Sequence, residues 1–269
     1  MLLVIDVGNT NTSLGVYNEE HLVAHWRLTT ARARTVDEYG VYSRNVLALA
    51  GIDSKIITAV AIASVVPPLN PVLKRMAEVY FHQTPLFIDH QTDTGMPILY
   101  DPPSDVGADR IVDSVAAINK YGTPIIVVDF GTATTFDAVN KEGQYLGGVI
   151  TPGIMISSEA LFARAARLPR VEIRQPSQVI GRSTVGSMQS GLYYGYVGLV
   201  DGIIKRMLEE LDGATRIVAT GGLAPLIATG SKLIETVDDT LTLEGMRLIY
   251  QRNSKMGVRS QESRVRMEE

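Results

Sequence analysis

Short, fully apolar runs alternate along this chain with longer segments whose apolar residues recur at helical spacing. The runs Leu2 to Ile5 and Ile125 to Val128 are typical of buried strands. Each run is followed by two further strand-like stretches, so residues 2–28 and residues 124–150 each predict a three-stranded meander. Additional strands are predicted over residues 58–66, 86–89 and 216–219.

Helical spacing predicts six helices, over residues 36–50, 70–80, 108–121, 156–166, 186–211 and 242–250. Gly51 suits the end of the first helix, and Pro71 suits the first turn of the second. The predicted order is βββ-α-β-α-β, and then βββ-α again with a final strand and helix. We therefore expect an α/β fold with two related halves, residues 1–117 and 118–252. The polar segment 253–269 shows no periodicity and predicts a disordered tail.

Two segments at equivalent places in these halves have nearly the same sequence. Asp6-Val7-Gly8-Asn9-Thr10-Asn11-Thr12 follows the first apolar run, and Asp129-Phe130-Gly131-Thr132-Ala133-Thr134-Thr135 follows its counterpart. Glycine lets backbone N–H groups approach a phosphate closely, hydroxyls donate further hydrogen bonds, and an Asp at a strand end can organise a cation. One such loop alone is equally compatible with an ordinary hairpin turn. The matched pair favours two loops facing each other across a nucleotide cleft.

The common phosphate-binding signatures are absent from the sequence. There is no Gly-x4-Gly-Lys-Ser/Thr, and no Gly-x-Gly-x2-Gly stands in a strand–helix turn. The predicted phosphate site therefore requires a different scaffold.

Three further segments carry possible chemistry. Gly107-Ala108-Asp109-Arg110 opens a predicted helix, where spacing alone favours Asp109 as a carboxylate that stabilises the helix dipole. The alternative is that Asp109 accepts a substrate proton and Arg110 binds an anion. The segment from Gly147 to Gly153 and the segment Thr220-Gly221-Gly222 indicate either tight turns or backbone lying close to a ligand.

Composition narrows the classes of function. With no Cys, the chain has no disulfide, thiolate metal site or Cys nucleophile, and none of its four His has a metal-ligand spacing. A net charge of −4 argues against a nucleic-acid-binding protein. No apolar stretch is long enough to span a membrane, and Met1 is followed directly by a strand-like run rather than a basic leader. We therefore expect a cytoplasmic protein that binds neither nucleic acid nor membrane.

Together with Leu241-Thr242-Leu243-Glu244-Gly245, these motifs resemble, in order over residues 1–250, those of type III pantothenate kinase. The resemblance implies the actin-like ATPase and sugar kinase superfold, with two ribonuclease-H-like halves and a nucleotide between them. It also implies ATP-dependent phosphorylation of the primary hydroxyl of pantothenate, the first step of coenzyme A biosynthesis. Family members are homodimers in which the second subunit helps to close the pantothenate pocket, and the glycine-faced helix from Gly186 is our candidate for part of that contact.

The resemblance also assigns roles to residues of this chain. Asp109 matches the catalytic base, Asp6 lies near the magnesium of Mg-ATP, and Asp129 matches the residue that helps to hold a monovalent cation, K⁺ or NH4⁺. The ATP-binding positions are Asp6, Val7, Gly8, Asn9, Thr10, Asn11, Thr12, Ser13 and Thr132. The pantothenate-binding positions are Tyr100, Gly107, Ala108, Asp109, Arg110 and Thr184.

Two other functions remain open at this point. One is a different phosphotransferase on the same scaffold, acting on a sugar or an acetate-like acid. The other is a nucleotide-driven regulatory protein, since some relatives have been described as accessory transcription factors. A chain of 269 residues leaves little room for the inserted subdomains of actin-like switches, and a net charge of −4 disfavours DNA binding.

Overall fold

The structure, a computed structural model, describes the backbone of residues 1–268 and the side chains of residues 1–255. The chain folds into two compact units. Unit 1 comprises Met1–Met96, Asp101–Ala116 and Leu241–Glu269, and unit 2 comprises Pro97–Tyr100 and Ala117–Thr240.

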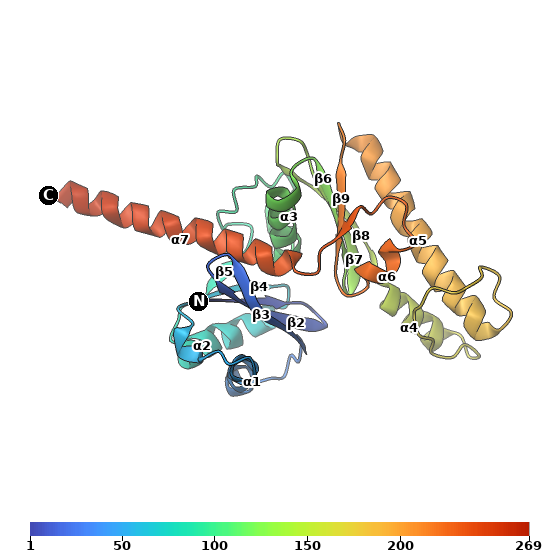
Figure 1. Ribbon diagram of the computed structural model, residues 1–269, viewed down its shortest axis with the longest axis horizontal. Coiled ribbons are helices and arrows are strands. Elements are labelled where there is room, and N and C mark those ends of the chain that lie inside the picture. The colour runs from blue at the N-terminus through green and yellow to red at the C-terminus, as the bar shows by residue number, and fades with distance from the viewer. Residues whose placement is uncertain (269) are drawn as a thin grey trace. The chain divides into compact units, whose positions relative to one another are not determined.

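The sheet of unit 1 has five strands in the order β3-β2-β1-β4-β5. Its strands are β1 (Leu2–Val7), β2 (Asn11–Asn18), β3 (His21–Thr29), β4 (Ala59–Ser64) and β5 (Leu86–Ile88). Strands β1, β2 and β3 form an antiparallel meander, whereas β4 and β5 run parallel to β1. Figure 1 shows these strands in blue to cyan.

The sheet of unit 2 repeats this plan strand for strand, in the order β8-β7-β6-β9-β10. Its strands are β6 (Ile125–Phe130), β7 (Ala133–Val139), β8 (Tyr145–Pro152), β9 (Arg216–Thr220) and β10 (Thr236–Val237). Strands β6, β7 and β8 form the antiparallel meander, and β9 and β10 run parallel to β6. The predicted α/β fold with duplicated halves is confirmed by this equivalence.

The central strands β1 and β6 show why the two apolar runs predict the core. Both strands are buried at every position except the fifth, where Asp6 and Asp129 are half-buried. Five apolar residues in each strand are thus removed from water, and this burial is the main favourable contribution to folding. The single carboxylate stands near the carboxyl end of the strand, where a parallel sheet leaves backbone and side chains available to a ligand.

The helices complete the hydrophobic cores of the two units. In sequence they are α1 (Val36–Leu49), α2 (Asn70–Phe81), α3 (Ala108–Tyr121), α4 (Ile154–Arg164), α5 (Thr184–Glu210), α6 (Ala224–Ala228) and α7 (Leu241–Glu268). Short 3-10 helices cover Ser54–Ile56, Pro67–Leu69 and Pro103–Asp105. The two helices α1 and α2 pack against each other and supply residues to the unit 1 core, and residues of α4, α5 and α6 supply the core of unit 2.

The last helix belongs to unit 1, whereas the order of elements in the sequence predicts residues 241–252 as part of the second half. Helix α7 packs on β1, β2, β4 and β5, and buries Leu241, Leu243, Met246 and Ile249. Gly245 allows a close approach, because an added Cβ would overlap the carbonyl of Val112 in α3.

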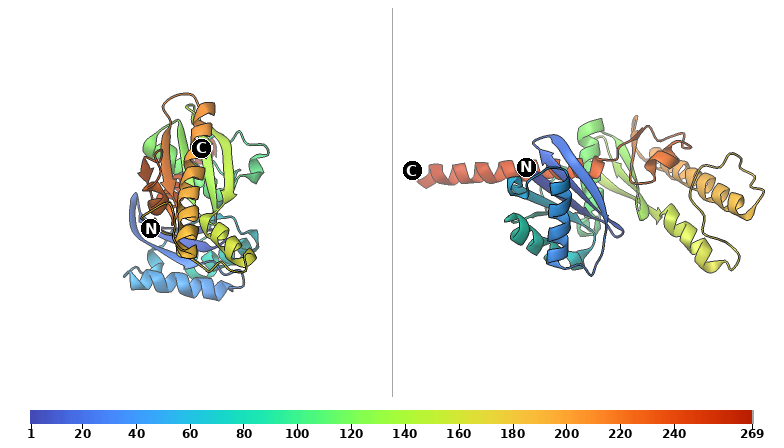
Figure 2. Two further views of the ribbon diagram at one scale, coloured as in Figure 1. Left: turned by 90° about the vertical axis from the view of Figure 1, so that its right-hand side faces the viewer. Right: turned by 60° about the horizontal axis from the view of Figure 1, so that its bottom comes forward.

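The helix α7 also continues over residues 253–268, the segment that the sequence analysis treats as a disordered tail, and Glu269 lies outside the described residues. Figure 2 shows α7 as one continuous helix. Within the described part of the chain, no helix is both long and apolar enough to cross a membrane.

Candidate functional site

The first of the two matched loops joins β1 to β2 in unit 1. Asp6 lies opposite Ser13 of β2 and opposite Ala63 of β4. The turn is closed by the Gly8 amide, which donates to the Asn11 carbonyl over 2.9 Å. An added Cβ on Gly8 would stand 3.0 Å from that carbonyl, so glycine keeps this turn tight.

This loop is braced by the segment that follows β3, which the sequence analysis did not single out. The Thr30 hydroxyl donates to the Gly8 carbonyl over 2.8 Å and shares a 2.8 Å hydrogen bond with the buried Thr12 hydroxyl. Arg32 donates to the Asn9 side chain over 3.0 Å. Thr30 and Arg32 reach the loop only because β3 pairs with β2, a long-range relation that no local motif signals.

The second matched loop joins β6 to β7 in unit 2, and glycines surround its carboxylate. Asp129 lies opposite Thr135 of β7 and opposite Thr220 of β9. An added Cβ on Gly131 would stand 3.1 Å from Asp129 Oδ2, and one on Gly221 would overlap Asp129 Oδ1. Gly221 also has φ +93°, a conformation that favours glycine. The weak glycine motif after β9 therefore forms part of the surroundings of Asp129.

The glycine-rich segment along β8 ends against the same loop. The Gly153 amide donates to the Thr132 carbonyl over 3.2 Å. An added Cβ on Gly153 would overlap that carbonyl, so glycine is required for this close backbone approach. Thr132 itself is exposed, and the hydrogen bond from Gly153 to its carbonyl fixes its backbone.

Asp109 lies in the first turn of α3, where the sequence pattern predicts it. The Arg110 amide donates to Asp109 Oδ1 over 2.8 Å, and an added Cβ on Gly107 would stand only 2.5 Å from the same oxygen. Burial raises the pKa of the Asp109 carboxyl, although the Arg110 amide bond and the Arg110 charge oppose this change. The Asp109 carboxyl therefore lies at the start of α3 in surroundings that disfavour its ionised form.

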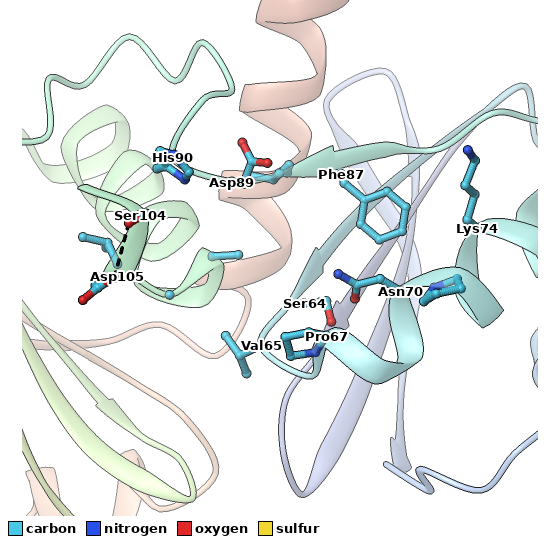
Figure 3. A pocket seen from close by; sticks show the side chains of 15 residues that line it. Ser64, Val65, Pro67, Asn70, Lys74, Phe87, Asp89, His90, Ser104 and Asp105 are labelled. Carbon is cyan, nitrogen blue, oxygen red and sulfur yellow. Dashed lines mark hydrogen bonds between the residues drawn. The ribbon is translucent and has the colours of Figure 1, made fainter. Parts of the chain in front are cut away.

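A cavity of about 600 Å³ opens in unit 1 beside this helix start. It is lined by the end of β4, the start of α2, the end of β5 and residues 104–108, which include the predicted positions Gly107 and Ala108. Figure 3 shows Asn70 and Phe87 on one side of it and His90 and Ser104 on the other.

The same cavity adjoins the strand end that carries the first loop. Ser64, which lines the cavity, is in register with Val7, and the Val65 amide donates to the Val7 carbonyl over 3.1 Å. The Gly107–Asp109 turn and the Asp6 loop therefore occupy one edge of the unit 1 sheet. Asn70, Lys74 and His90 also line the cavity, and no sequence motif marks them.

The remaining predicted pantothenate positions belong to unit 2. Tyr100 is half-buried, and its ring centroid lies 6.5 Å from that of Tyr145. Thr184 is the first residue of α5 and is exposed; it lines a second cavity of about 750 Å³ together with Leu161 of α4 and Met188. The predicted set is thus carried partly by unit 1, at Gly107–Arg110, and partly by unit 2.

The carboxylates of the two matched loops suit a metal ion that a bound ligand also coordinates. Among the residues that the structure describes, no three His, Cys, Asp or Glu side chains lie together as a metal cage. Asp6 and Asp129 are instead single carboxylates beside glycine turns and hydroxyl residues. Mg²⁺ is commonly held by one or two carboxylates together with water and substrate phosphates, so a single carboxylate such as Asp6 fits Mg-ATP.

Comparisons with known proteins agree with this geometry. Residues 2–206 match the family model described as type III pantothenate kinase. The type III pantothenate kinase of Koribacter versatilis is 59% identical over 263 residues, which cover 94% of this chain and 96% of that protein.

Two solved structures share the fold at low identity. A Baf family transcriptional activator from Campylobacter jejuni aligns with a TM-score of 0.60 at 20% identity, over 94% of this chain and 99% of that one. A 2-dehydro-3-deoxygalactonokinase from Sinorhizobium meliloti aligns with a TM-score of 0.55 at 13% identity, over 95% and 96% of the two chains.

Proposed function

This chain belongs to the type III pantothenate kinase family, and on that basis we propose how its residues divide the work of phosphorylating pantothenate. The reaction transfers the γ-phosphoryl group of ATP to an alcohol of pantothenate, in coenzyme A biosynthesis. Family membership favours this activity over a sugar or acetate kinase and over a regulatory switch. The likeness to the Campylobacter protein concerns the fold alone.

We assign the proton-accepting role to Asp109, and this assignment carries the proposal. The Asp109 carboxylate takes the proton of the pantothenate hydroxyl as that oxygen attacks the γ-phosphorus, while the bond from that phosphorus to the bridging oxygen of ADP breaks. Burial raises the pKa of Asp109, which strengthens it as a base near neutral pH. The Arg110 amide fixes one carboxylate oxygen, Oδ1, and the Arg110 guanidinium is assigned to the substrate carboxylate.

The phosphates of ATP are assigned to the two matched loops. Residues 6–13 form the first phosphate loop, and its turn is held rigid by Gly8, Thr30 and Thr12. Thr132 belongs to the second loop, which Gly153 holds from behind. Phosphoryl transfer depends mainly on positioning and on charge stabilisation, so a preformed backbone cradle is the contribution expected of the protein.

We assign Asp6 to Mg²⁺ and Asp129 to a monovalent cation, K⁺ or NH4⁺. When bound, these ions supply positive charge that stabilises the transferring phosphoryl group. The glycines around Asp129 support its assignment, because they leave the carboxylate accessible where any side chain would cover it. We also propose a cytoplasmic location, where ATP is available.

We further propose a homodimer in which a second copy helps to close the pantothenate pocket. Helix α4 exposes Met155, Ile156, Leu161 and Phe162, each with 40% to 54% of its surface accessible. Several large apolar side chains left exposed on one helix are candidates for burial in a protein interface. It adjoins Thr184 through the cavity that Leu161 and Thr184 both line.

A coupled assay of ADP release tests the assignment of function. We expect ADP release that depends on pantothenate and falls strongly when sodium replaces potassium. The assay is repeated with Asp129→Asn, which should lose the difference between potassium and sodium. ADP release independent of pantothenate would refute the kinase assignment, whereas equal rates in both salts would refute only the cation assignment.

A further inference from the structure

The segment that carries Tyr100 is fastened to the edge of the unit 2 sheet at a single residue, Tyr145. The Leu99 amide donates to the Tyr145 carbonyl over 2.9 Å, and the Tyr145 amide donates to the Pro97 carbonyl over 2.9 Å. Residues 97–99 are thereby paired with the start of β8, immediately before Tyr100. The hydrogen bonds to Tyr145 therefore fix the backbone immediately before Tyr100.

The Tyr145 side chain is in turn fixed by a buried carboxylate. Tyr145 is fully buried, and its hydroxyl donates to Asp137 Oδ1 over 2.7 Å. Asp137 is 1% exposed, and its other oxygen accepts a 3.2 Å hydrogen bond from the Thr135 hydroxyl. A hydrogen bond to a buried carboxylate is charge-assisted, and it holds the phenol ring in one orientation.

The Tyr100 ring rests on this fixed ring. The two ring planes are tilted by 53° at a centroid separation of 6.5 Å, which is a favourable aromatic arrangement. Two residues after Tyr145 on β8, Gly147 has φ +123°, and an added Cβ there would lie 3.1 Å from the Tyr100 ring. The Tyr100 ring is therefore positioned by Tyr145 and by the bare backbone of Gly147.

We propose that Asp137 and Tyr145 are positioning residues that orient Tyr100 for the acceptor substrate. This inference rests on the proposed contact between Tyr100 and pantothenate. A ring that is held before binding loses less conformational entropy on binding, so the pair increases affinity for pantothenate. None of these three side chains is among the residues assigned to ATP, so their substitution is expected to leave ATP binding unchanged.

The first test is Tyr145→Phe, which removes only the hydroxyl. We expect the KM for pantothenate to rise about tenfold, the effect of roughly one buried hydrogen bond, while the KM for ATP changes less than about twofold. Tyr121→Phe is the matched control, because the Tyr121 hydroxyl donates to Asp238 over 2.8 Å, a bond of the same chemistry elsewhere in unit 2. Asp137→Asn keeps an acceptor for Tyr145 and should have a smaller effect on the pantothenate KM.

Two further measurements separate positioning from simple damage to the fold. In a Tyr100→Ala background, Tyr145→Phe should cause no additional rise in the pantothenate KM. In protein labelled with fluorotyrosine, the ¹⁹F resonance of Tyr100 should shift in Tyr145→Phe and stay in place in Tyr121→Phe.

Three results would overturn the inference: equal rises in both KM values, additive effects of the two tyrosine substitutions, or an unchanged Tyr100 resonance. The resonance is measured without turnover. A failure of the proposed pantothenate kinase activity would therefore appear in the unsubstituted protein's assay and would not be confused with a failure of positioning.

Discussion

The carboxyl group of Asp109 lies in surroundings that disfavour its ionised form. Burial raises its pKa against the opposing effects of the Arg110 amide and charge. Residues that serve catalysis often reduce stability, because their surroundings are arranged for the reaction rather than for the folded state. Ionised Asp109 therefore lowers the free energy of unfolding, and an uncharged side chain of similar shape would raise it.

Asp109→Asn should remove most activity and increase stability at neutral pH. The loss of the base should lower kcat about 10² to 10⁴-fold. The folded-state pKa is raised, so ionisation reduces stability as pH rises from the unfolded-state pKa through the folded-state pKa. The variant should therefore have a higher Tm than the original protein at pH 7, and the difference should vanish below about pH 4. Thermal unfolding across this pH range, with kcat measured in parallel, checks both parts.

A Tm difference that stays constant with pH would show that the carboxylate charge is not its cause. Near-normal turnover of the Asn variant would exclude Asp109 as the base.

Gly221→Ala should displace the Asp129 carboxylate, in addition to straining the backbone at a positive φ. The new Cβ would overlap Asp129 Oδ1 and lie 2.7 Å from the Phe130 backbone. We expect a loss of potassium dependence and a lowered Tm. Gly143→Ala is the matched control, since Gly143 also has a positive φ, +75°, but nothing lies within 4 Å of an added Cβ. If both variants keep potassium dependence, Gly221 does not form part of the cation site.

Local sequence indicates some residues of the candidate site better than others. The two Asp-Gly-hydroxyl loops and the start of α3 were visible because each motif is contiguous. Thr30 carries no motif, and the motif that contains Gly221 does not indicate Asp129 as its neighbour. Their contacts with Gly8 and Asp129 arise from strand pairing between distant segments. The pKa of Asp109 depends on burial, which no spacing rule conveys.

The buried carboxylate of Asp238, which follows β10, links the end of α3 to the residue that precedes α7. Asp238 accepts from Lys120 over 2.5 Å and from Tyr121 over 2.8 Å, both at the end of α3. Its other oxygen accepts from the amide and hydroxyl of Thr240, next to the first residue of α7. Burial opposes ionisation of Asp238, but the hydrogen bonds from Lys120 and Tyr121, the Lys120 charge and the Thr240 amide bond outweigh it and lower the pKa of Asp238.

Asp238→Asn should destabilise the protein by about 1 to 3 kcal/mol at pH 7, because several donors lose a charged acceptor. A lowered folded-state pKa means that the stabilisation is present above the unfolded-state pKa and is lost as pH falls through the folded-state pKa. The difference in unfolding free energy should therefore shrink below about pH 4.

Glu235→Gln is the control for this prediction, measured by the same denaturant unfolding. Glu235 pairs with Arg216 at 3.4 Å, but both side chains are largely exposed, so the effect should stay within about 0.5 kcal/mol. Equal effects of the two substitutions would contradict the importance assigned to burial of Asp238.

Helix and strand boundaries were predictable where an element is long and periodic. The helix over residues 108–121 has the predicted bounds. Helix α6 and strand β10 have only five and two residues, too few for a pattern, and they form because β9 offers them a packed surface and a pairing edge. The assignment of α7 to unit 1 depends on which sheet its apolar stripe covers, and periodicity alone does not specify that sheet.

At the scale of the whole molecule, the duplicated fold leaves the apolar face of α4 exposed in a single copy. If that face forms the proposed dimer contact, Ile156→Glu should convert a dimer into monomers, because an unpaired charge would be buried on association. Analytical ultracentrifugation measures the change, and pantothenate turnover should fall with it. Leu49→Glu on α1 is the control, because Leu49 is 87% exposed in unit 1 and should tolerate the charge without a change of mass. A monomeric unsubstituted protein, or a dimeric Ile156→Glu variant, would contradict the proposal.

The placement of α7 also determines when the first sheet can be completed during synthesis. Met96 ends the first continuous stretch of unit 1, and Leu241, where its covering helix begins, follows 145 residues later. At about 5 to 20 residues per second, a ribosome needs roughly seven to thirty seconds to make that interval. Throughout that time the nascent sheet lacks Leu243, which lies against Gly15, and Arg247, which lies over Tyr17. The amino-terminal sheet is therefore synthesised with the face that α7 covers still open to water, and exposed apolar surface of this kind is what chaperones bind.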